Sequence, residues 1–275
     1  MNKKIKICVI TGSRAEYGLL FNLIKLLKES DFFKLQLVVT GTHFSSDHGY
    51  TYKEIVKDGL KIDKKIDLKI SANNPIDVAK QMSEAINGFA QTYEKLKPNI
   101  VLLLGDRYEI ICSSLVATIF NIPIAHIHGG EVTKGSVDNA FRHSITKMAN
   151  FHFVASKQSK CRVIQLGEKN KNIFNVGSLG IENTRKLKLL TKQEIKKFLK
   201  INFDLPIFLI TFHSETLSNI PIKNQIKPLL DALEEIKNTK FIFTSSNSDV
   251  GGNIINEKII KFVKKNRNAQ YFKNL

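Results

Sequence analysis

The feature that most constrains this chain is a repeated pattern in which a short apolar run ends in glycine and charge and a helical segment follows. Its clearest copies are the run 100–104, which ends in Gly-Asp-Arg at 105–107, and the run 122–127, which ends in His-Gly-Gly-Glu at 128–131. Alternation at this spacing is typical of βαβ units and predicts a parallel, Rossmann-like sheet. Ligands of such sheets bind outside the carboxyl ends of the strands, so the charged strand ends are candidates for a functional site.

The same alternation predicts the rest of the fold. The expected strands are residues 5–10, 35–40, 100–104, 122–127, 151–155, 173–176, 206–211, 240–244 and 270–272. The expected helices include residues 51–57, 77–96, 157–166, 222–237 and 254–265. We therefore predict an α/β protein with two Rossmann-like domains, the first at 1–178 and an incomplete second at 206–275, joined by a lysine-rich linker region at 179–205.

Composition limits the class of partner. The 42 Lys and Arg residues outnumber the 25 Asp and Glu residues and give a net charge of +17, which would suit a nucleic acid if the basic residues were clustered. They are scattered instead, so we expect a basic surface that steers anionic substrates, and no nucleic-acid partner. No apolar run reaches the roughly 20 residues that span a bilayer, and the amino terminus shows no signal pattern. We expect a cytoplasmic protein with no membrane partner.

The cysteines predict neither disulfides nor a metal site. Cys8, Cys112 and Cys161 are far apart in the sequence and lack metal-ligand spacing. Their apolar neighbours indicate reduced core or near-core residues.

The loop after the first expected strand is a candidate anion site. Gly12, Ser13 and Arg14 lead directly into a segment of helical periodicity. Free amide groups and the dipole at a helix N-terminus favour an anion, and the guanidinium of Arg14 matches the geometry of a phosphate. The loop fits neither the Gly-x-Gly-x-x-Gly fingerprint nor a P-loop, so by itself it is a weak indication.

A set of short motifs occurs in order along the chain. It comprises Thr-Gly-Ser-Arg-Ala-Glu-Tyr-Gly at 11–18, Thr-Gly-Thr-His at 40–43, Leu-Gly-Asp-Arg-Tyr-Glu at 104–109, His-Ile-His-Gly-Gly-Glu at 126–131, Asp-Asn-Ala-Phe-Arg-His-Ser-Ile-Thr-Lys at 138–147, Gln-Leu-Gly-Glu at 165–168, Val-Gly-Ser at 176–178 and Phe-His at 212–213. This ordered set resembles the hydrolysing UDP-N-acetylglucosamine 2-epimerases of sialic-acid and legionaminic-acid synthesis. The resemblance covers essentially the whole chain.

The resemblance implies a GT-B architecture, with a nucleotide sugar bound between two Rossmann-like domains. It implies conversion of UDP-GlcNAc, or of UDP-2,4-diacetamido-2,4,6-trideoxyglucose, into the free manno-configured N-acetyl sugar and UDP. The reaction eliminates UDP and then adds water, and it needs neither a cofactor nor a metal. A homodimer or homotetramer formed through the first domain is also implied.

Inversion at C2 needs one group to remove a proton and another to return one. The resemblance places Asp106, His128, Glu131 and Asp138 at the family's acid–base positions. Many members carry Glu where this chain has His128. Either His128 takes over that proton transfer, which the ordinary pKa of histidine permits, or Glu131 does.

Further motif residues are implied to bind the substrate, and several have alternative roles. The implied set is Arg14, His43, Arg142, His143, His213, Glu215 and Asn247. Arg142 lies four residues after Asp138, so on a helix it can share the face of Asp138 and orient it. Asp138 could equally cap that helix, and Glu16 and Glu109 could serve only as negative charges at helix N-termini.

Family members continue beyond the position where this chain ends, through a Gly- and Ser-rich loop that holds UDP. We therefore expect that a segment is missing and that these 275 residues release little UDP. Two alternatives to the epimerase remain open at this stage. The chain could be a GT-B glycosyltransferase, or an inactive remnant of an epimerase.

Overall fold

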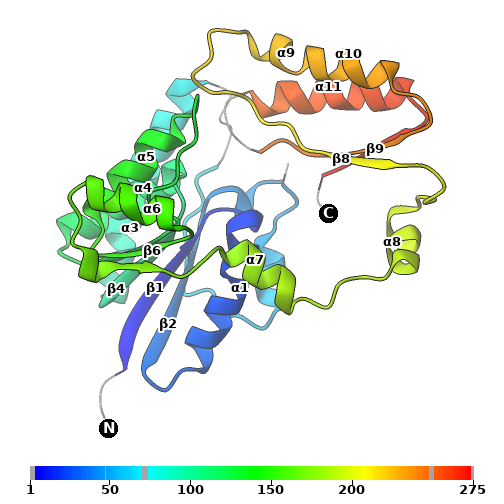
Figure 1. Ribbon diagram of the computed structural model, residues 1–275. Coiled ribbons are helices and arrows are strands. Elements are labelled where there is room, and N and C mark those ends of the chain that lie inside the picture. Colours follow the sequence, from blue (N-terminus) through cyan, green and yellow to red (C-terminus); the bar gives the residue numbers. More distant parts are fainter. Residues whose placement is uncertain (1–3, 47, 70–73, 248–250, 274–275) are drawn as a thin grey trace. The chain divides into compact units, whose positions relative to one another are not determined.

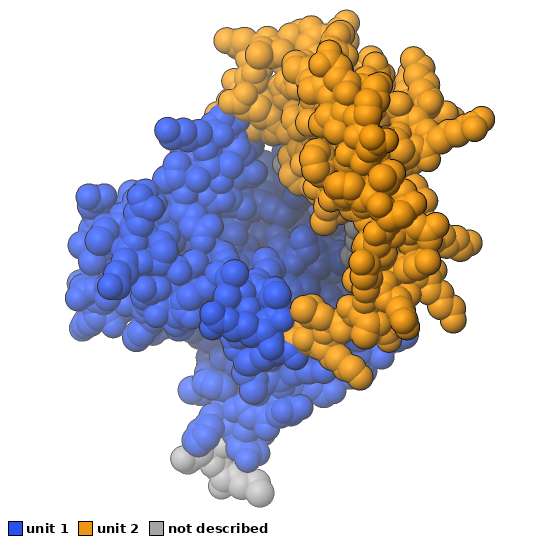
Figure 2. All heavy atoms as spheres, turned by 45° about the vertical axis from the view of Figure 1, so that its right-hand side comes forward, with its two compact units in different colours: residues 1–71, 76–186 blue, residues 72–75, 187–275 orange. Residues whose placement is uncertain are grey.

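The computed structural model describes residues 4–46, 48–69, 74–247 and 251–273. The chain divides into two compact units (Figure 2). Unit 1 comprises residues 1–71 and 76–186, and unit 2 comprises residues 72–75 and 187–275. Each unit is built on its own parallel sheet, which confirms the predicted α/β class.

Unit 1 holds a seven-stranded parallel sheet of order β3-β2-β1-β4-β5-β6-β7. The strands are β1 (Ile5–Thr11), β2 (Phe33–Val39), β3 (Lys64–Lys65), β4 (Ile100–Leu104), β5 (Ile124–Ile127), β6 (Phe151–Val154) and β7 (Ile173–Asn175). The chain winds outward in both directions from β1 and β4, which are neighbours. The strand order therefore reverses between β1 and β4, where open α/β sheets bind their ligands.

Helices cover both faces of this sheet (Figure 1). They are α1 (Arg14–Glu29), η1 (Gly41–Phe44), α2 (Tyr52–Lys57), α3 (Pro75–Leu96), α4 (Tyr108–Ile119), α5 (Asp138–Met148), α6 (Lys157–Gln165), η2 (Asn170–Asn172) and α7 (Leu179–Lys186). Helix α1 packs Leu20 and Ile24 against one face of the sheet, and α3 and α4 pack Phe89 and Ile110 against the other. Strands buried on both faces are continuously apolar, which explains the apolar runs in the sequence.

Unit 2 holds a three-stranded parallel sheet of order β10-β9-β8. Its elements are α8 (Lys192–Leu199), β8 (Ile207–Ile210), α9 (Ile222–Gln225), α10 (Lys227–Glu235), β9 (Lys240–Thr244), α11 (Gly252–Lys265) and β10 (Ala269–Phe272). Helices α9 to α11 lie together on one face (Figure 1), where Phe241 and Phe243 pack against Ile255 and Ile259. Leu209 of β8 is 66% exposed.

The structure differs from the sequence prediction in several places. The single helix expected at 222–237 is two helices that meet at Ile226. Pro228 lacks the amide donor that a continuous helix would need at this position, but it is tolerated in the first turn of α10, so a new helix begins here. The short strand β3 was not predicted, because two lysines carry no apolar pattern. Cys161, expected near the core, is exposed.

The segment predicted as a linker is divided between the units. Helix α7 belongs to unit 1, and the boundary falls after Lys186. The side chain of Asn183 fixes α7 to α1, since its Nδ2 donates to the carbonyl of Gly18 at 2.8 Å. Helix α8 begins in unit 2 with a reciprocal capping box between Thr191 and Glu194.

Candidate active site at the carboxyl edge of the first sheet

The candidate acid–base residues lie at the ends of two neighbouring strands and on the helix that follows. Asp106 lies two residues after the end of β4, and His128 and Glu131 come after β5, which pairs with β4. Asp138 and Arg142 lie on α5. Parallel pairing puts both strand ends at one edge of the sheet, so residues distant in sequence meet there.

Asp106 and Arg142 form an ion pair at this edge. Arg142 Nη2 donates to Asp106 Oδ2, and both terminal nitrogens of Arg142 also contact Thr133 Oγ1 at 3.1 Å. The two charged side chains are largely buried, with exposures of 10% for Arg142 and 17% for Asp106. Burial lowers the pKa of Arg142, but a guanidinium stays charged at neutral pH. Arg142 therefore ties α5 to the loop after β4 and holds the Asp106 carboxylate in place.

The buried side chain of His126 contacts the residue that precedes Asp106 and a residue of the helix that carries Arg142. His126 Nε2 donates to the carbonyl of Gly105 at 2.7 Å, and its Nδ1 lies 3.2 Å from Thr146 Oγ1. Burial is the main cause that lowers the pKa of His126 to about 4, so the ring is neutral. A Cβ on Gly129 would lie 2.9 Å from both His126 Nδ1 and Thr146 Oγ1, so only glycine fits there.

His128 and Glu131 form a second polar pair. His128 Nδ1 lies 3.2 Å from Glu131 Oε1, and the His128 backbone has a φ of 64°, in the left-handed region that non-glycine residues rarely adopt. Its Nε2 is buried and has no hydrogen-bond partner within the described part of the chain. With Nδ1–H donating to the carboxylate, Nε2 carries the lone pair and can accept a proton. This geometry is typical of an imidazole oriented for acid–base work.

Asp138 occupies the first turn of α5. The N-cap position belongs to Val137, so Asp138 is not the capping residue that was one alternative. Its Oδ2 accepts a hydrogen bond from Ser136 Oγ at 2.9 Å, and the helix N-terminus favours its negative charge.

His143, on the same helix, is half-buried. Its pKa is lowered mainly by burial and also by the charges of Arg142 and Arg162. Its Nδ1 is buried with no hydrogen-bond partner among the described residues.

The two predicted binding residues near β1 and β2 have different surroundings. Arg14 Nε contacts Glu54 Oε2 at 3.1 Å, and both side chains are more than a third exposed, so the pair is weak and can yield to a ligand. His43 is completely buried. Its ring nitrogens contact Thr11 Oγ1 at 3.0 Å and Thr51 Oγ1 at 2.8 Å, and burial lowers its pKa to about 4. Both ring nitrogens of His43 are thus engaged inside unit 1.

The predicted residues of unit 2 gather where β8 and β9 end. His213 Nδ1 accepts from the backbone amide of Asn247 at 3.1 Å and lies 3.3 Å from Ser246 Oγ. The proton of the neutral ring is therefore on Nε2, which suits donation to an anion. Glu215 is exposed, and its backbone groups bond to the side chain of Gln225.

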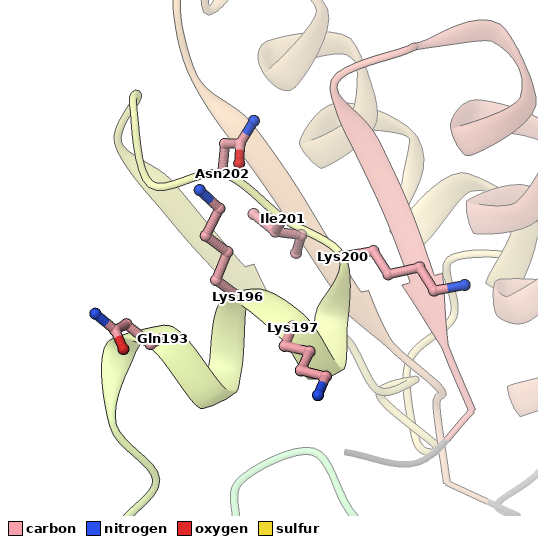
Figure 3. A pocket seen from close by; sticks show the side chains of 6 residues that line it. All are labelled: Gln193, Lys196, Lys197, Lys200, Ile201 and Asn202. Carbon is pink, nitrogen blue, oxygen red and sulfur yellow. The ribbon is translucent and has the colours of Figure 1, made fainter.

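A separate concave surface of unit 2 follows helix α8 (Figure 3). Its lining residues are Gln193, Lys196, Lys197, Lys200, Ile201 and Asn202. None of the predicted site residues is among them. Lysines on one exposed helix face are common on a basic surface, so we assign no function to this hollow.

The structure adds residues that sequence reasoning missed. Thr146 is four residues after Arg142, a helical spacing that could have revealed it, whereas nothing in the sequence marked Thr133. The described residues contain no group of three or more His, Cys, Asp or Glu placed to hold a metal ion. Within the same residues, no helix has the length and apolar character needed to cross a membrane.

The two parallel sheets and the polar groups at strand ends define a GT-B-like α/β protein of Rossmann type. The fold is shared with the crystal structure of a Methanocaldococcus jannaschii UDP-GlcNAc 2-epimerase in complex with UDP-GlcNAc and UDP. That structure superposes with a TM-score of 0.80 at 17% identity, covering 98% of this chain and 73% of that one. Residues 25–275 match the family model for UDP-N-acetylglucosamine 2-epimerase. The chain belongs to this family, as the sequence motifs predicted.

Two relatives are closer in sequence. A hydrolysing GDP/UDP-N,N'-diacetylbacillosamine 2-epimerase of Campylobacter jejuni is 40% identical over 273 residues, which are 99% of this chain and 71% of that protein. The polysialic acid biosynthesis protein P7 of Escherichia coli is 42% identical over 261 residues, 94% of this chain and 66% of that protein. The chain thus spans about two thirds of the length of these relatives.

Proposed function

We propose that this chain catalyses the hydrolysing 2-epimerisation of a UDP-N-acetylhexosamine, giving the free manno-configured N-acetyl sugar and UDP. The observation that carries the proposal is the pairing of Asp106 with Arg142 beside the His128–Glu131 pair, on neighbouring strand ends. Two acid–base groups in unlike surroundings are what inversion of a carbon centre requires.

The first step is an elimination. A base takes the proton from C2, the C1–O bond to UDP breaks, and the electron pair of the C–H bond forms the C1=C2 double bond of a glycal. We assign one acid–base role to His128, because its Nε2 carries a buried lone pair while Glu131 orients the ring. UDP departs with the electrons of the broken bond, so cations and donors near the diphosphate lower the barrier. Arg14 and His213 are the proposed contributors.

The second step adds water across the double bond. The hydroxyl group joins C1, and a proton joins C2 on the face opposite to the one it left. We assign this second acid–base role to Asp106, whose carboxylate is fixed by Arg142. The carboxylate takes a proton from the attacking water and passes it to C2, while the proton that His128 took in the first step goes to solvent. Asp138, at the start of the same helix as Arg142, is a supporting carboxylate. We leave His43 out of the binding residues because both its ring nitrogens are engaged with threonines.

The substrate is proposed from the relatives. The Campylobacter jejuni relative is named for a diacetamido sugar nucleotide, N,N'-diacetylbacillosamine. The Methanocaldococcus jannaschii enzyme, at 17% identity, binds UDP-GlcNAc. The Escherichia coli relative, which is 42% identical, is named for polysialic acid biosynthesis instead. We therefore propose UDP-GlcNAc and the UDP-2,4-diacetamido-2,4,6-trideoxy sugar as the two candidate substrates, and the assay below decides between them.

The direct test is to incubate the purified chain with each UDP sugar and no acceptor. We expect each UDP released, even where the amount is small, to be matched by one free manno-configured sugar, identified by NMR, and the UDP sugar that is turned over faster to be the substrate. A free gluco-configured sugar would instead indicate simple hydrolysis. Product that forms only when an acceptor sugar is present would indicate a glycosyltransferase.

We also propose that the chain forms a homo-oligomer through unit 1. Ile86 on α3 and Leu115 and Ile119 on α4 are exposed by 38%, 38% and 75%, and these helices cover the same face of the sheet. Apolar side chains exposed together favour a protein contact. Light scattering should give at least twice the monomer mass, whereas a monomeric mass that persists at high concentration would contradict this.

A further inference from the structure

The loop that carries His128 and Glu131 is held by elements other than its own strand. It leaves β5 with the amide of His128 donating to the carbonyl of Phe153, on β6, at 2.9 Å. Its next fixed point is Gly130, which has a φ of 76° and lies against helix α6. A Cβ on Gly130 would lie 2.5 Å from the carbonyl oxygen of Ser159, so the loop and the helix touch backbone to backbone. Glycine is required there because no side chain fits into this contact.

Arg162, on α6, holds the same point of the loop. Its Nη1 donates to the carbonyl of Gly130, the residue immediately before Glu131. A charged donor makes a stronger hydrogen bond to a carbonyl than a neutral donor does. The contact joins residues 32 positions apart in the sequence and ties a helix to a loop that contains no helix or strand. Arg162 therefore fixes the backbone between His128 and Glu131.

The same loop is also attached to helix α5. Both terminal nitrogens of Arg142 contact Thr133 Oγ1 at 3.1 Å, and the same guanidinium donates to Asp106. The amide of Thr133 donates to Asn139 Oδ1 at 3.2 Å. The loop is thus held by one arginine from α5 and by another from α6. Because the arginine of α5 also holds Asp106, these attachments together set the placement of the two proposed acid–base groups.

A histidine of α5 senses both arginines. Burial lowers the pKa of His143, and the positive charges of Arg142 and Arg162 lower it further. A charge has this effect only when it lies near the titrating group. Arg162 therefore belongs to the surroundings of the acid–base groups, although its helix follows the next strand of the sheet.

We propose that Arg162 is a positioning residue, which holds the Gly130 carbonyl and so keeps Glu131 in contact with His128 Nδ1. The inference rests on the proposed function, because that function assigns proton transfer to His128. Without the donor of Arg162, the loop can relax from its positive φ angles at His128 and Gly130. The ring of His128 then loses the acceptor that keeps its proton on Nδ1, and Nε2 no longer carries the lone pair in every molecule.

The first measurement needs no substrate. In protein labelled with ¹⁵N in the histidine rings, the signals of His128 are identified by their absence in His128→Gln. Spectra are taken at pH 9, above the ordinary histidine pKa of about 6.5, so that the ring is neutral. We expect a protonated Nδ1 in the wild type and a mixture of both tautomers in Arg162→Gln. A wild-type ring that is protonated on Nε2, or the same tautomer in both proteins, overturns the inference.

The second measurement is kinetic. Arg162→Gln should lower kcat for UDP release by roughly 10-fold, because misplacement of a reacting group by about 1 Å can cost up to roughly 100-fold. The affinity for UDP, measured by calorimetry, should change by less than about 2-fold, since the proposed diphosphate contacts come from Arg14 and His213. A loss of UDP affinity with an unchanged kcat would make Arg162 a binding residue and overturn its positioning role.

Arg162→Lys tests the hydrogen bond itself. The contact uses one N–H instead of a bidentate fork, so an ammonium group can replace it. Both the tautomer of His128 and kcat should return toward the wild-type values. If Arg162→Gln does not fold by circular dichroism, Arg162→Met replaces it, because methionine keeps an apolar stem and lacks the donor.

Lys157→Gln is the matched control, because Lys157 is an exposed cation on the same helix. It should behave as the wild type in both measurements. Equal losses in the Lys157 and Arg162 variants overturn the inference, and so does the absence of any rescue by lysine. A wild-type chain that releases no UDP contradicts the proposed function alone, because the ring tautomer still decides whether Arg162 positions His128.

Discussion

The two units hold their polar residues in different ways. In unit 1 the charged groups at the sheet edge are largely buried and paired, as Asp106 is with Arg142 and Glu109 with Arg107. In unit 2 the corresponding strand ends carry side chains near the surface, among them the exposed His213 and Glu215. Burial shifts a pKa and fixes an orientation, whereas a surface contact does neither strongly. We therefore propose that unit 1 carries out proton transfer and that unit 2 contributes only to nucleotide binding.

The largest expected effect is on Asp106. Asp106→Asn should lower turnover by roughly 100-fold or more, because a positioned acid–base group is lost while the shape of the side chain is kept. The measurement is kcat for UDP release, with circular dichroism to confirm folding. The matched change in unit 2, Glu215→Gln, should leave kcat nearly unchanged. A comparable loss in both variants would remove the distinction between the units.

The second prediction distinguishes His128 from Glu131. His128→Gln should lower kcat by roughly 100-fold, and Glu131→Gln by about 10-fold, because the first carries the proton and the second only orients the ring. Both variants need kcat and KM values at several pH values. The opposite order of the two losses would assign the proton transfer to Glu131.

The third prediction concerns stability against pH. The pKa of Glu16 is about 8 in the folded chain, above its ordinary value of 4.5, so the folded state binds the proton more tightly than the unfolded state. The resulting stability is present at low pH and is lost as pH rises from about 4.5 through 8. Glu16→Gln should therefore raise the free energy of unfolding at pH 8 by about 1–3 kcal/mol. Urea melts at pH 5 and pH 8 would measure this, and an equal or lower stability of the variant at pH 8 would count against it.

The smallest effect is expected at the surface of unit 1. Glu54→Gln removes the ion pair between Glu54 and Arg14, whose side chains are both more than a third exposed. The free energy of unfolding should change by less than about 1 kcal/mol. UDP affinity should not fall, because Glu54 is not among the residues proposed to bind UDP. A thermal melt and one calorimetric titration suffice, and a large loss of stability would mean that this pair is structural.

Much of the architecture could be predicted from the sequence, because apolar runs that end in glycine mark buried parallel strands. The split at Ile226 was missed because the apolar period continues through Pro228, and β3 was missed because a two-residue edge strand carries no pattern. The motifs correctly predicted the family. They could not reveal that Arg142 reaches Asp106, or that both ring nitrogens of His43 contact threonines, since these contacts depend on how the loops fold over the sheet.

The groups at the edge of the first sheet are proposed to exchange the proton at C2. The most direct measurement is deuterium incorporation at C2 of the free sugar when the reaction is run in D₂O, for the wild type and for Asp106→Asn and His128→Gln. We predict one deuterium at C2 in every product molecule of the wild type, and roughly 100-fold slower formation of this product in both variants. Wild-type product that keeps hydrogen at C2, or variants that form deuterated product at the wild-type rate, would contradict the account.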